Sequence, residues 1–260
     1  MDVEYGLLLK GRRIDIAVAT ERDRKRLRVY RISPDTGLLT DVSSDRLQVF
    51  EGETGEKSAP MGVGLYRRPS DGTIFAIVSR KEGPLKNYLW QYKLIDDGKG
   101  KVKAVKVREF GRFSGVKEIE SVAVDDAAGY VYYSDETRGV RKYYADPDKP
   151  GADKELAFFA TSGYTGDHEG IAVYAKQNGK GYIICTDQIK GKSRYNLYDR
   201  RSTPSGTSPL KIISGADDTD GIEAASSPFG SRFPLGILVV MNSKDRNFLI
   251  YCWKDVEDRL

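Results

Sequence analysis

The chain has 260 residues, of which 39% are hydrophobic and 31% are charged, with a net charge of +4. This length can bury a substantial core, and the composition is ordinary for a globular protein. No apolar run approaches the roughly 18 residues of a membrane-spanning helix, and no basic stripe with interleaved aromatic residues indicates nucleic-acid binding. The first residues, MDVEYGLLLKGRR, lack the basic and apolar regions of a signal peptide, so the sequence leaves the compartment open.

Hydrophobic and polar residues alternate along most of the chain, and the apolar runs are short and rich in Val, Ile and Tyr, which favours strands. One module recurs: an apolar strand that ends in small polar or acidic residues, a polar loop, and a second strand rich in Tyr. In chain order the predicted strand pairs are 14–20 with 27–32, 74–79 with 88–94, 131–135 with 140–144, 182–186 with 194–198, and 236–241 with 247–253.

Further strands flank these pairs. A short strand is predicted before each pair, at residues 3–8, 61–66, 120–124, 169–174 and 221–225. A fourth strand is predicted after several of them, at residues 103–110, 156–160 and 210–214. The modules begin roughly 50 to 60 residues apart, which is the spacing of propeller blades with long loops.

Sequential groups of four strands, repeated about five times, predict an all-β fold: a β-propeller with about five four-stranded blades. Each blade leaves its faces unburied until neighbours pack on it, so we expect the array to close into a ring. The alternative is a β-sandwich or an irregular barrel, but sandwiches rarely repeat a four-strand module at this period. Residues 1–260 are therefore expected to form a single domain.

Two local features are interpreted as structural. The basic run Arg22-Asp-Arg-Lys-Arg26 is typical of a solvated hairpin tip. Cys185 and Cys252 lie far apart in apolar runs and match no metal-ligand spacing, so two buried free thiols are expected, although a single disulfide remains open.

Acidic and amide residues recur where a propeller gathers side chains on one rim, at the starts of the innermost strands and the ends of the second ones. They are Glu120, Asp135, Glu136, Asp167, Glu169, Asp187, Gln188, Asp218 and Asp220. Carboxylates on one rim repel one another unless a cation neutralises them, and oxygen-only ligands favour Ca²⁺ over zinc or copper. Any one of these acids alone is better explained as a turn residue or a solvated rim residue. Their recurrence at equivalent positions is what indicates a calcium site.

Several other chemistries are excluded. His168 is the only histidine in the sequence, so mechanisms that need two histidines are out, and we expect this one to be structural. Phosphocysteine chemistry needs an Arg six residues after the Cys, where Gly191 and Asp258 stand instead. The run Asp218-Thr-Asp-Gly lacks the later Glu of an EF-hand. If the chain is an enzyme, attack by water with the help of a metal ion is the remaining mechanism.

At these residues the sequence resembles the β-propeller phytases, which are calcium-dependent alkaline 3-phytases. The most specific blocks are DHEGIAVY, RYNLYDR and DTDGI. The resemblance runs over nearly the whole chain in the family's order, at residues 11–33, 62–94, 107–148, 166–200 and 218–241.

The resemblance implies a six-bladed propeller that hydrolyses phytate (myo-inositol hexakisphosphate), with several Ca²⁺ ions that hold the substrate phosphates and activate a water. The predicted metal ligands are Glu120, Glu136, Asp167, Glu169, Gln188, Asp218 and Asp220. Glu120, Glu136 and Glu169 are also the predicted catalytic residues. Arg22 and Lys81 fall on the cations that contact phosphate, where Arg suits bidentate contacts and Lys acts as a point charge.

The sequence departs from the family at its N-terminal side. A region of about one blade, with an Asp-Asp-Pro-Ala-(Ile/Val)-Trp calcium motif and a pair of substrate lysines, has no counterpart, so the domain is expected to be N-terminally incomplete. Met61 stands where the family has a tyrosine at the calcium–phosphate centre, and a thioether cannot supply a hard oxygen. A family loop just before Asp217 is shortened, which removes another acid. In the family an added N-terminal strand completes the last blade, for which only three strands are predicted here.

The leading hypothesis is a calcium-dependent phosphomonoester hydrolase, a 3-phytase-like phosphatase acting on phytate. The alternative is a catalytically weakened propeller that binds anions or a partner, and a calcium-dependent lactonase-type propeller is a third possibility. We expect no nucleic-acid or membrane partner, and a monomer unless another chain completes the ring. The family resemblance suggests a secreted protein.

Overall fold

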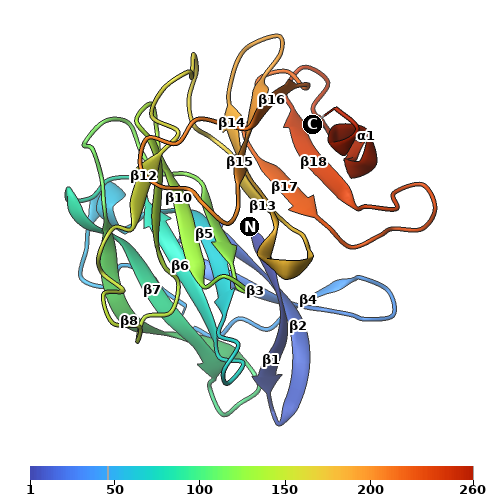
Figure 1. Cartoon of the computed structure of the whole chain (residues 1–260). Coiled ribbons are helices and arrows are strands. Elements are labelled where there is room, and N and C mark those ends of the chain that lie inside the picture. Colours follow the sequence, from blue (N-terminus) through green and yellow to red (C-terminus); the bar gives the residue numbers. More distant parts are fainter. Residues whose placement is uncertain (46, 260) are drawn as a thin grey trace. The chain divides into compact units, whose positions relative to one another are not determined.

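The computed structural model describes residues 1–45 and 47–259, and strands make up most of its regular secondary structure (Figure 1). Helical segments in this part of the chain are short: η1 (Gly55–Ser58), η2 (Gln177–Gly179) and α1 (Trp253–Glu257). Among the described residues, no helix has the length and apolar character needed to cross a membrane. The chain divides into two compact units, the first formed by Met1–Val131 with Tyr143–Glu155 and the second by Tyr132–Lys142 with Leu156–Leu260.

The first unit contains two four-stranded sheets, each with its strands in chain order. One sheet consists of β1 (Asp2–Leu9), β2 (Arg12–Glu21), β3 (Arg26–Ile32) and β4 (Leu39–Asp41). The other consists of β5 (Pro60–Arg67), β6 (Ile74–Arg80), β7 (Lys86–Asp96) and β8 (Val102–Arg112). Neighbouring strands are antiparallel, with Val18 of β2 opposite Val29 of β3 and Ile77 of β6 opposite Gln91 of β7.

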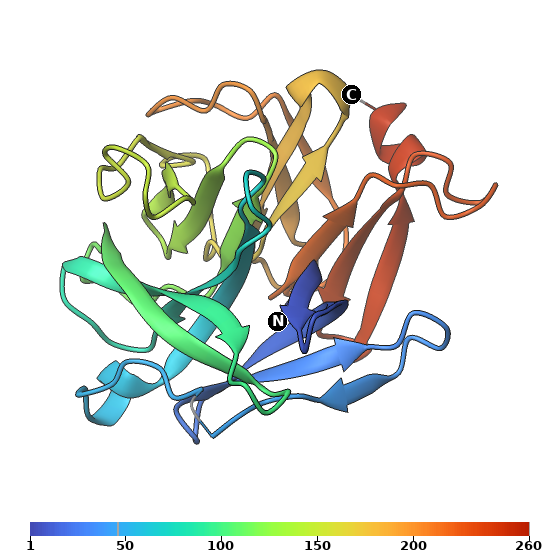
Figure 2. The same ribbon diagram turned by 90° about the horizontal axis from the view of Figure 1, so that it is seen from below.

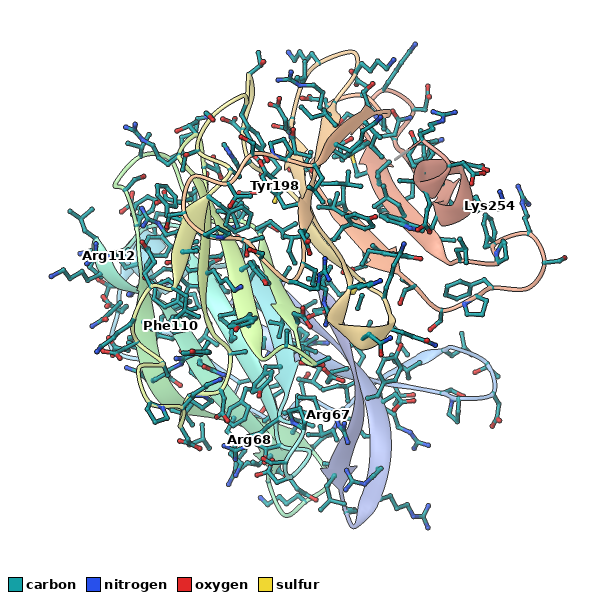
Figure 3. All side chains as sticks on the ribbon, viewed as in Figure 1. Arg67, Arg68, Phe110, Arg112, Tyr198 and Lys254 are labelled. Atoms are coloured by element: carbon teal, nitrogen blue, oxygen red, sulfur yellow. The ribbon has the colours of Figure 1, made fainter. Side chains whose placement is uncertain are left out.

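The core of the first unit joins the faces of these two sheets. It includes Val18, Leu27, Val63, Ala76 and Tyr92, all of which are buried. β6 is buried at every position, which explains why its sequence is a nearly continuous apolar run rather than an alternating one. Outside this core, Phe110 of β8, labelled in Figure 3, packs edge-on against Tyr143 with ring centroids 5.4 Å apart.

The second unit contains a four-stranded and a three-stranded sheet, again with strands in chain order. The former consists of β13 (Ile171–Ala175), β14 (Gly181–Asp187), β15 (Arg194–Asp199) and β16 (Lys211–Ser214). The latter consists of β17 (Ile222–Ala225), β18 (Ile237–Asn242) and β19 (Asn247–Cys252), and α1 follows it directly (Figure 2). Trp253 at the start of α1 is fully buried and stacks on Tyr174 of β13, with ring centroids 3.6 Å apart.

One more sheet contains β9 (Val122–Asp125), β10 (Tyr130–Asp135), β11 (Gly139–Tyr144) and β12 (Ala157–Phe159). Its residues are divided between the units. Within the second unit, Val140 of β11 lies opposite Phe159 of β12. The described residues thus form five sheets of sequential strands, four of them four-stranded, which is the blade topology of a β-propeller. The predicted fold class is confirmed, while the assignment of residues 1–260 to one domain stays a prediction.

The predicted strands agree with the observed ones to within a few residues, with two corrections at the C-terminal end. The last strand was expected to run to Trp253, but it ends at Cys252 and Trp253 begins α1. The Trp253 ring is thereby turned into the core, where it covers Tyr174. Both cysteines are free thiols, as expected, but only Cys185 is buried, because Cys252 lies half-buried on the outer strand β19.

Candidate functional site

Three of the predicted metal ligands come together in the second unit. Glu136 is the first residue of the turn between β10 and β11, and Asp167 and Glu169 lie on the irregular segment that leads into β13. One carboxylate oxygen from each of the three lies within 4.8 Å of the others. Glu136 and Glu169 are buried and Asp167 is half-buried. These carboxylates are therefore close enough to share one cation.

A fourth predicted ligand joins them through Glu169. Oxygens of Glu169 and Asp220 also lie within 4.8 Å of each other. Asp220 is exposed just before β17, and partial loss of hydration, with repulsion from the Asp218 carboxylate, raises its pKa. Glu136, Asp167, Glu169 and Asp220 are called the acidic cluster below. Asp218 is held by its backbone, whose N–H donates to the Ile189 carbonyl over 3.1 Å.

The segment that carries Asp167 and Glu169 is fixed against the end of β14. Asp167 and Gln188 form an isolated antiparallel bridge, in which the Gln188 N–H donates to the Asp167 carbonyl over 2.9 Å. Gly166 permits this approach, because a Cβ atom there would lie 1.7 Å from the Gln188 carbonyl oxygen. Gln188, a predicted ligand, is thus placed beside Asp167 by backbone pairing.

His168 anchors the same segment from the interior. The residue is 3% exposed, and its ring stacks on Tyr164 with centroids 3.8 Å apart and donates from Nε2 to the Ala160 carbonyl over 2.8 Å. Burial lowers the pKa of His168, so the imidazole is neutral at physiological pH. The Tyr164 hydroxyl lies 3.2 Å from that of Tyr198, which projects from β15 (Figure 3). These contacts agree with the structural role expected for this histidine.

The first unit contains the predicted phosphate-binding cations, and each faces a carboxylate. Arg22, in the turn between β2 and β3, lies 4.0 Å from Glu120, and its side chain is half exposed. Lys81, which follows β6, lies 2.5 Å from Glu118. Oxygens of Glu118 and Glu120 lie within 4.8 Å of each other. The first unit therefore brings two cations and two acids together. An exposed pair such as Arg22–Glu120 contributes little stability, so its partners can exchange for a ligand.

Met61 lies beside this group, on β5. Its side chain is buried, and its carbonyl accepts a hydrogen bond from the Thr20 hydroxyl over 2.8 Å. The neighbouring Gly62 is required here, because a Cβ atom would lie 2.0 Å from the Glu120 carbonyl oxygen. A buried thioether supplies no hard oxygen at this point.

Three residues near these groups differ from the sequence-based interpretation. Asp135 and Asp187 were expected on an acidic rim, but both are completely buried and paired with the arginines of the next strand, Arg141 and Arg194. Glu118, which pairs with Lys81, was not predicted at all. The sequence carries a signal for this pairing, because Arg141 follows Asp135 by six residues and Arg194 follows Asp187 by seven.

The donor atoms of the acidic cluster fit a hard cation. All four side chains are carboxylates, and Ca²⁺ binds six to eight oxygen ligands, with carboxylates chief among them. The described residues supply no histidine nitrogen or cysteine sulfur to this group, so the donor set does not favour zinc or copper. Fold and site together define a β-propeller with a candidate site for an oxygen-bound cation.

Comparisons with known proteins narrow down the family of the chain. The sequence model of the phytase family matches residues 1–260. The chain is 30% identical to the 3-phytase of Bacillus subtilis (strain 168) over 276 aligned positions, which cover 100% of this chain and 69% of the relative. It is also similar in structure to an alpha-L-arabinanase of Penicillium chrysogenum, with a TM-score of 0.61 at 16% identity over 96% of this chain and 76% of that one. The chain belongs to the phytase family, and with it to the phosphatases.

Proposed function

We propose that the chain releases phosphate from phytate in a calcium-dependent reaction, with water as the nucleophile. The observation that carries this proposal is the acidic cluster, in which oxygens of Glu136, Asp167 and Glu169 lie within 4.8 Å of one another. The 3-phytase of Bacillus subtilis supports phytate as the substrate. Family membership supports the class of reaction.

The acidic cluster would hold Ca²⁺ through its carboxylate oxygens, with Gln188 and Asp218 as further candidates for ligands. When bound, the ion supplies Lewis-acid chemistry, which offsets charge on phosphate oxygens and lowers the pKa of a water. The chain's own part is to fix the carboxylates. Asp167 is fixed by its bridge to Gln188, and Glu169 follows the buried His168.

Arg22 and Lys81 would bind substrate phosphate in the first unit. Arg22 offers a planar fork for two phosphate oxygens, and Lys81 offers a point charge. In the structure both face carboxylates, Glu120 and Glu118, so the cations stay near each other before substrate arrives. Phosphate oxygens carry more charge than a carboxylate and would compete for the same donors.

A second candidate function is anion binding without catalysis, and the buried Met61 side chain favours it. The thioether of Met61 stands where the phytase family has a tyrosine oxygen at the calcium–phosphate centre. One assay separates the two functions: phosphate release from phytate near neutral pH, with Ca²⁺ and with a chelator. The hydrolase reading predicts release that the chelator abolishes. An absence of release, together with a normal thermal stabilisation by Ca²⁺, would leave only the binding function.

The oligomeric state belongs to the proposal as well. We expect a monomer near the chain mass of 29.0 kDa, unless another chain completes the ring. Light scattering coupled to size-exclusion chromatography measures this mass directly. A mass near twice that value would mean that two chains associate.

A further inference from the structure

Asp187, at the end of β14, makes contacts unlike those of the predicted ligands. Its carboxylate is completely buried. One oxygen accepts the backbone N–H of Gly166 over 2.7 Å and that of Thr165 over 3.1 Å. The other accepts Nε of Arg194 over 2.9 Å. These donors use both oxygens of the carboxylate, so Asp187 binds other parts of the chain rather than an ion.

The two backbone groups that Asp187 holds belong to the segment that carries the acidic cluster. Thr165 and Gly166 directly precede Asp167 and Glu169, and the whole segment lies outside regular strands. Arg194 reaches the same segment, because its Nη2 donates to the Thr165 hydroxyl over 2.8 Å and to the Gly163 carbonyl over 3.1 Å. A charged carboxylate that accepts several N–H donors forms stronger bonds than a neutral acceptor does.

The same position is used again in the next sheet of this unit. Asn242 ends β18 as Asp187 ends β14, and its side-chain oxygen accepts the Asp217 N–H over 3.1 Å. The following residue, Ser243, donates from its hydroxyl to the Asp218 carbonyl over 3.0 Å. In both sheets, a buried polar residue at the end of the second strand accepts hydrogen bonds from the backbone of the acidic segment that leads into the first strand.

We propose that Asp187 is a positioning residue, which holds the segment 165–169 so that Asp167 and Glu169 are preorganised for the cation. This inference rests on the proposed function. Residues behind a metal ligand typically change metal affinity by about 10- to 100-fold when they are mutated. Asp187 acts through the backbone of the segment instead of through a ligand side chain, and the loss of its charge weakens every bond that it accepts.

The test is calorimetric titration of the calcium-free protein with Ca²⁺ alone, for the wild type, Asp187→Asn, Glu169→Gln and Asp199→Asn. Asp187→Asn keeps the shape but loses the charge, and it is expected to lower Ca²⁺ affinity by about tenfold. Asp199→Asn removes the charge of a half-buried partner of Arg201 in the same unit and is expected to leave the affinity unchanged. Hydrogen exchange of the Thr165 and Gly166 amides, measured without Ca²⁺, is expected to accelerate in Asp187→Asn only.

Each outcome is decisive. If Asp187→Asn binds Ca²⁺ like the wild type while Glu169→Gln does not, the positioning role is wrong and the proposed function stands. If the wild type itself fails to bind Ca²⁺, both fall. A lower melting temperature with unchanged affinity would reduce Asp187 to a structural residue. Should Asp187→Asn not fold, Arg194→Gln leaves the carboxylate only its backbone donors; we expect a several-fold loss of affinity, and an unchanged affinity overturns the proposal.

Discussion

This protein contains two groups of neighbouring carboxylates, and the repulsion between their negative charges is reduced in a different way in each group. In the first unit, Glu4 is 6% exposed and hydrogen-bonds to Asp126. Burial, with the nearby Asp126 charge, raises the pKa of Glu4 to about 8, so this pair shares a proton at neutral pH. In the second unit, the acidic cluster combines buried and exposed members on irregular segments.

The difference between the two groups shows how burial selects the neutralising species. Glu4 is buried within β1, and Asp126, which is half-buried in the turn after β9, accepts the Arg67 N–H, so the Glu4 carboxylate is withdrawn from solvent. A proton is the smallest charge that can enter such a place. Asp167 and Asp220 lie at least partly open to solvent on the segments that lead into strands, where an ion can reach them. Proximity of acids alone therefore does not indicate a metal site.

The largest effect is expected from neutralising the centre of the acidic cluster. Carboxylate oxygens of Glu169 lie within 4.8 Å of oxygens of Glu136, Asp167 and Asp220. Glu169→Gln therefore removes the negative charge that neighbours all three of these acids. We expect Ca²⁺ affinity to fall by about 100-fold or more, above the range for residues behind the ligands, and phosphate release to fall with it. Glu4→Gln is the matched control, because it removes an acid of the same type from the other group. Equal losses in the two variants would contradict the assignment.

A smaller effect is expected from the cations of the first unit. Lys81→Met removes a point charge, and a hydrogen bond to a charged group contributes about 1.5–3 kcal/mol. We expect KM for phytate to rise by about tenfold or more, with Ca²⁺ affinity unchanged. Steady-state kinetics over a range of phytate concentrations measures this. A fall in Ca²⁺ affinity without a change in KM would place Lys81 with the ion rather than with the substrate.

The smallest effect on activity, and the clearest on stability, concerns Glu4. Its pKa is about 8 when folded against an ordinary value of 4.5, so folding takes up a proton between these two values. Stability is therefore expected to fall as the pH rises from 4.5 to 8. Gln can donate to Asp126 and accept the Tyr5 N–H at any pH, so Glu4→Gln should flatten this slope. Urea titrations at pH 5 and pH 8 should show a gain on the order of 2 kcal/mol at pH 8 only. A parallel change at both pH values would mean that Glu4 is ionised in the fold.

Much of the fold follows from the sequence, because strand periodicity is local. The apolar run of β6 and the alternation of β3 both report their burial directly. The helix at Trp253 could not be predicted in this way, since its five residues are fixed by the stacking of Trp253 on Tyr174 rather than by helical periodicity.

The candidate site was predictable in part. Repeat position grouped Glu136, Asp167 and Glu169, whose oxygens lie within 4.8 Å of one another in the structure, while their role as metal ligands stays a prediction. It also placed Asp187 on the acidic rim, which is wrong, because sequence spacing does not show that Arg194 on the neighbouring strand pairs with it. Pairing across strands decides whether an acid faces a ligand or a buried arginine.

The central claim is that the acidic cluster binds Ca²⁺. A crystal structure grown with Ca²⁺, with anomalous diffraction data to identify the ion, tests it most directly. We expect an anomalous peak bound by carboxylate oxygens of Glu136, Asp167 and Glu169. A clear map at those residues without an anomalous peak, at a Ca²⁺ concentration that supports phosphate release, would contradict it.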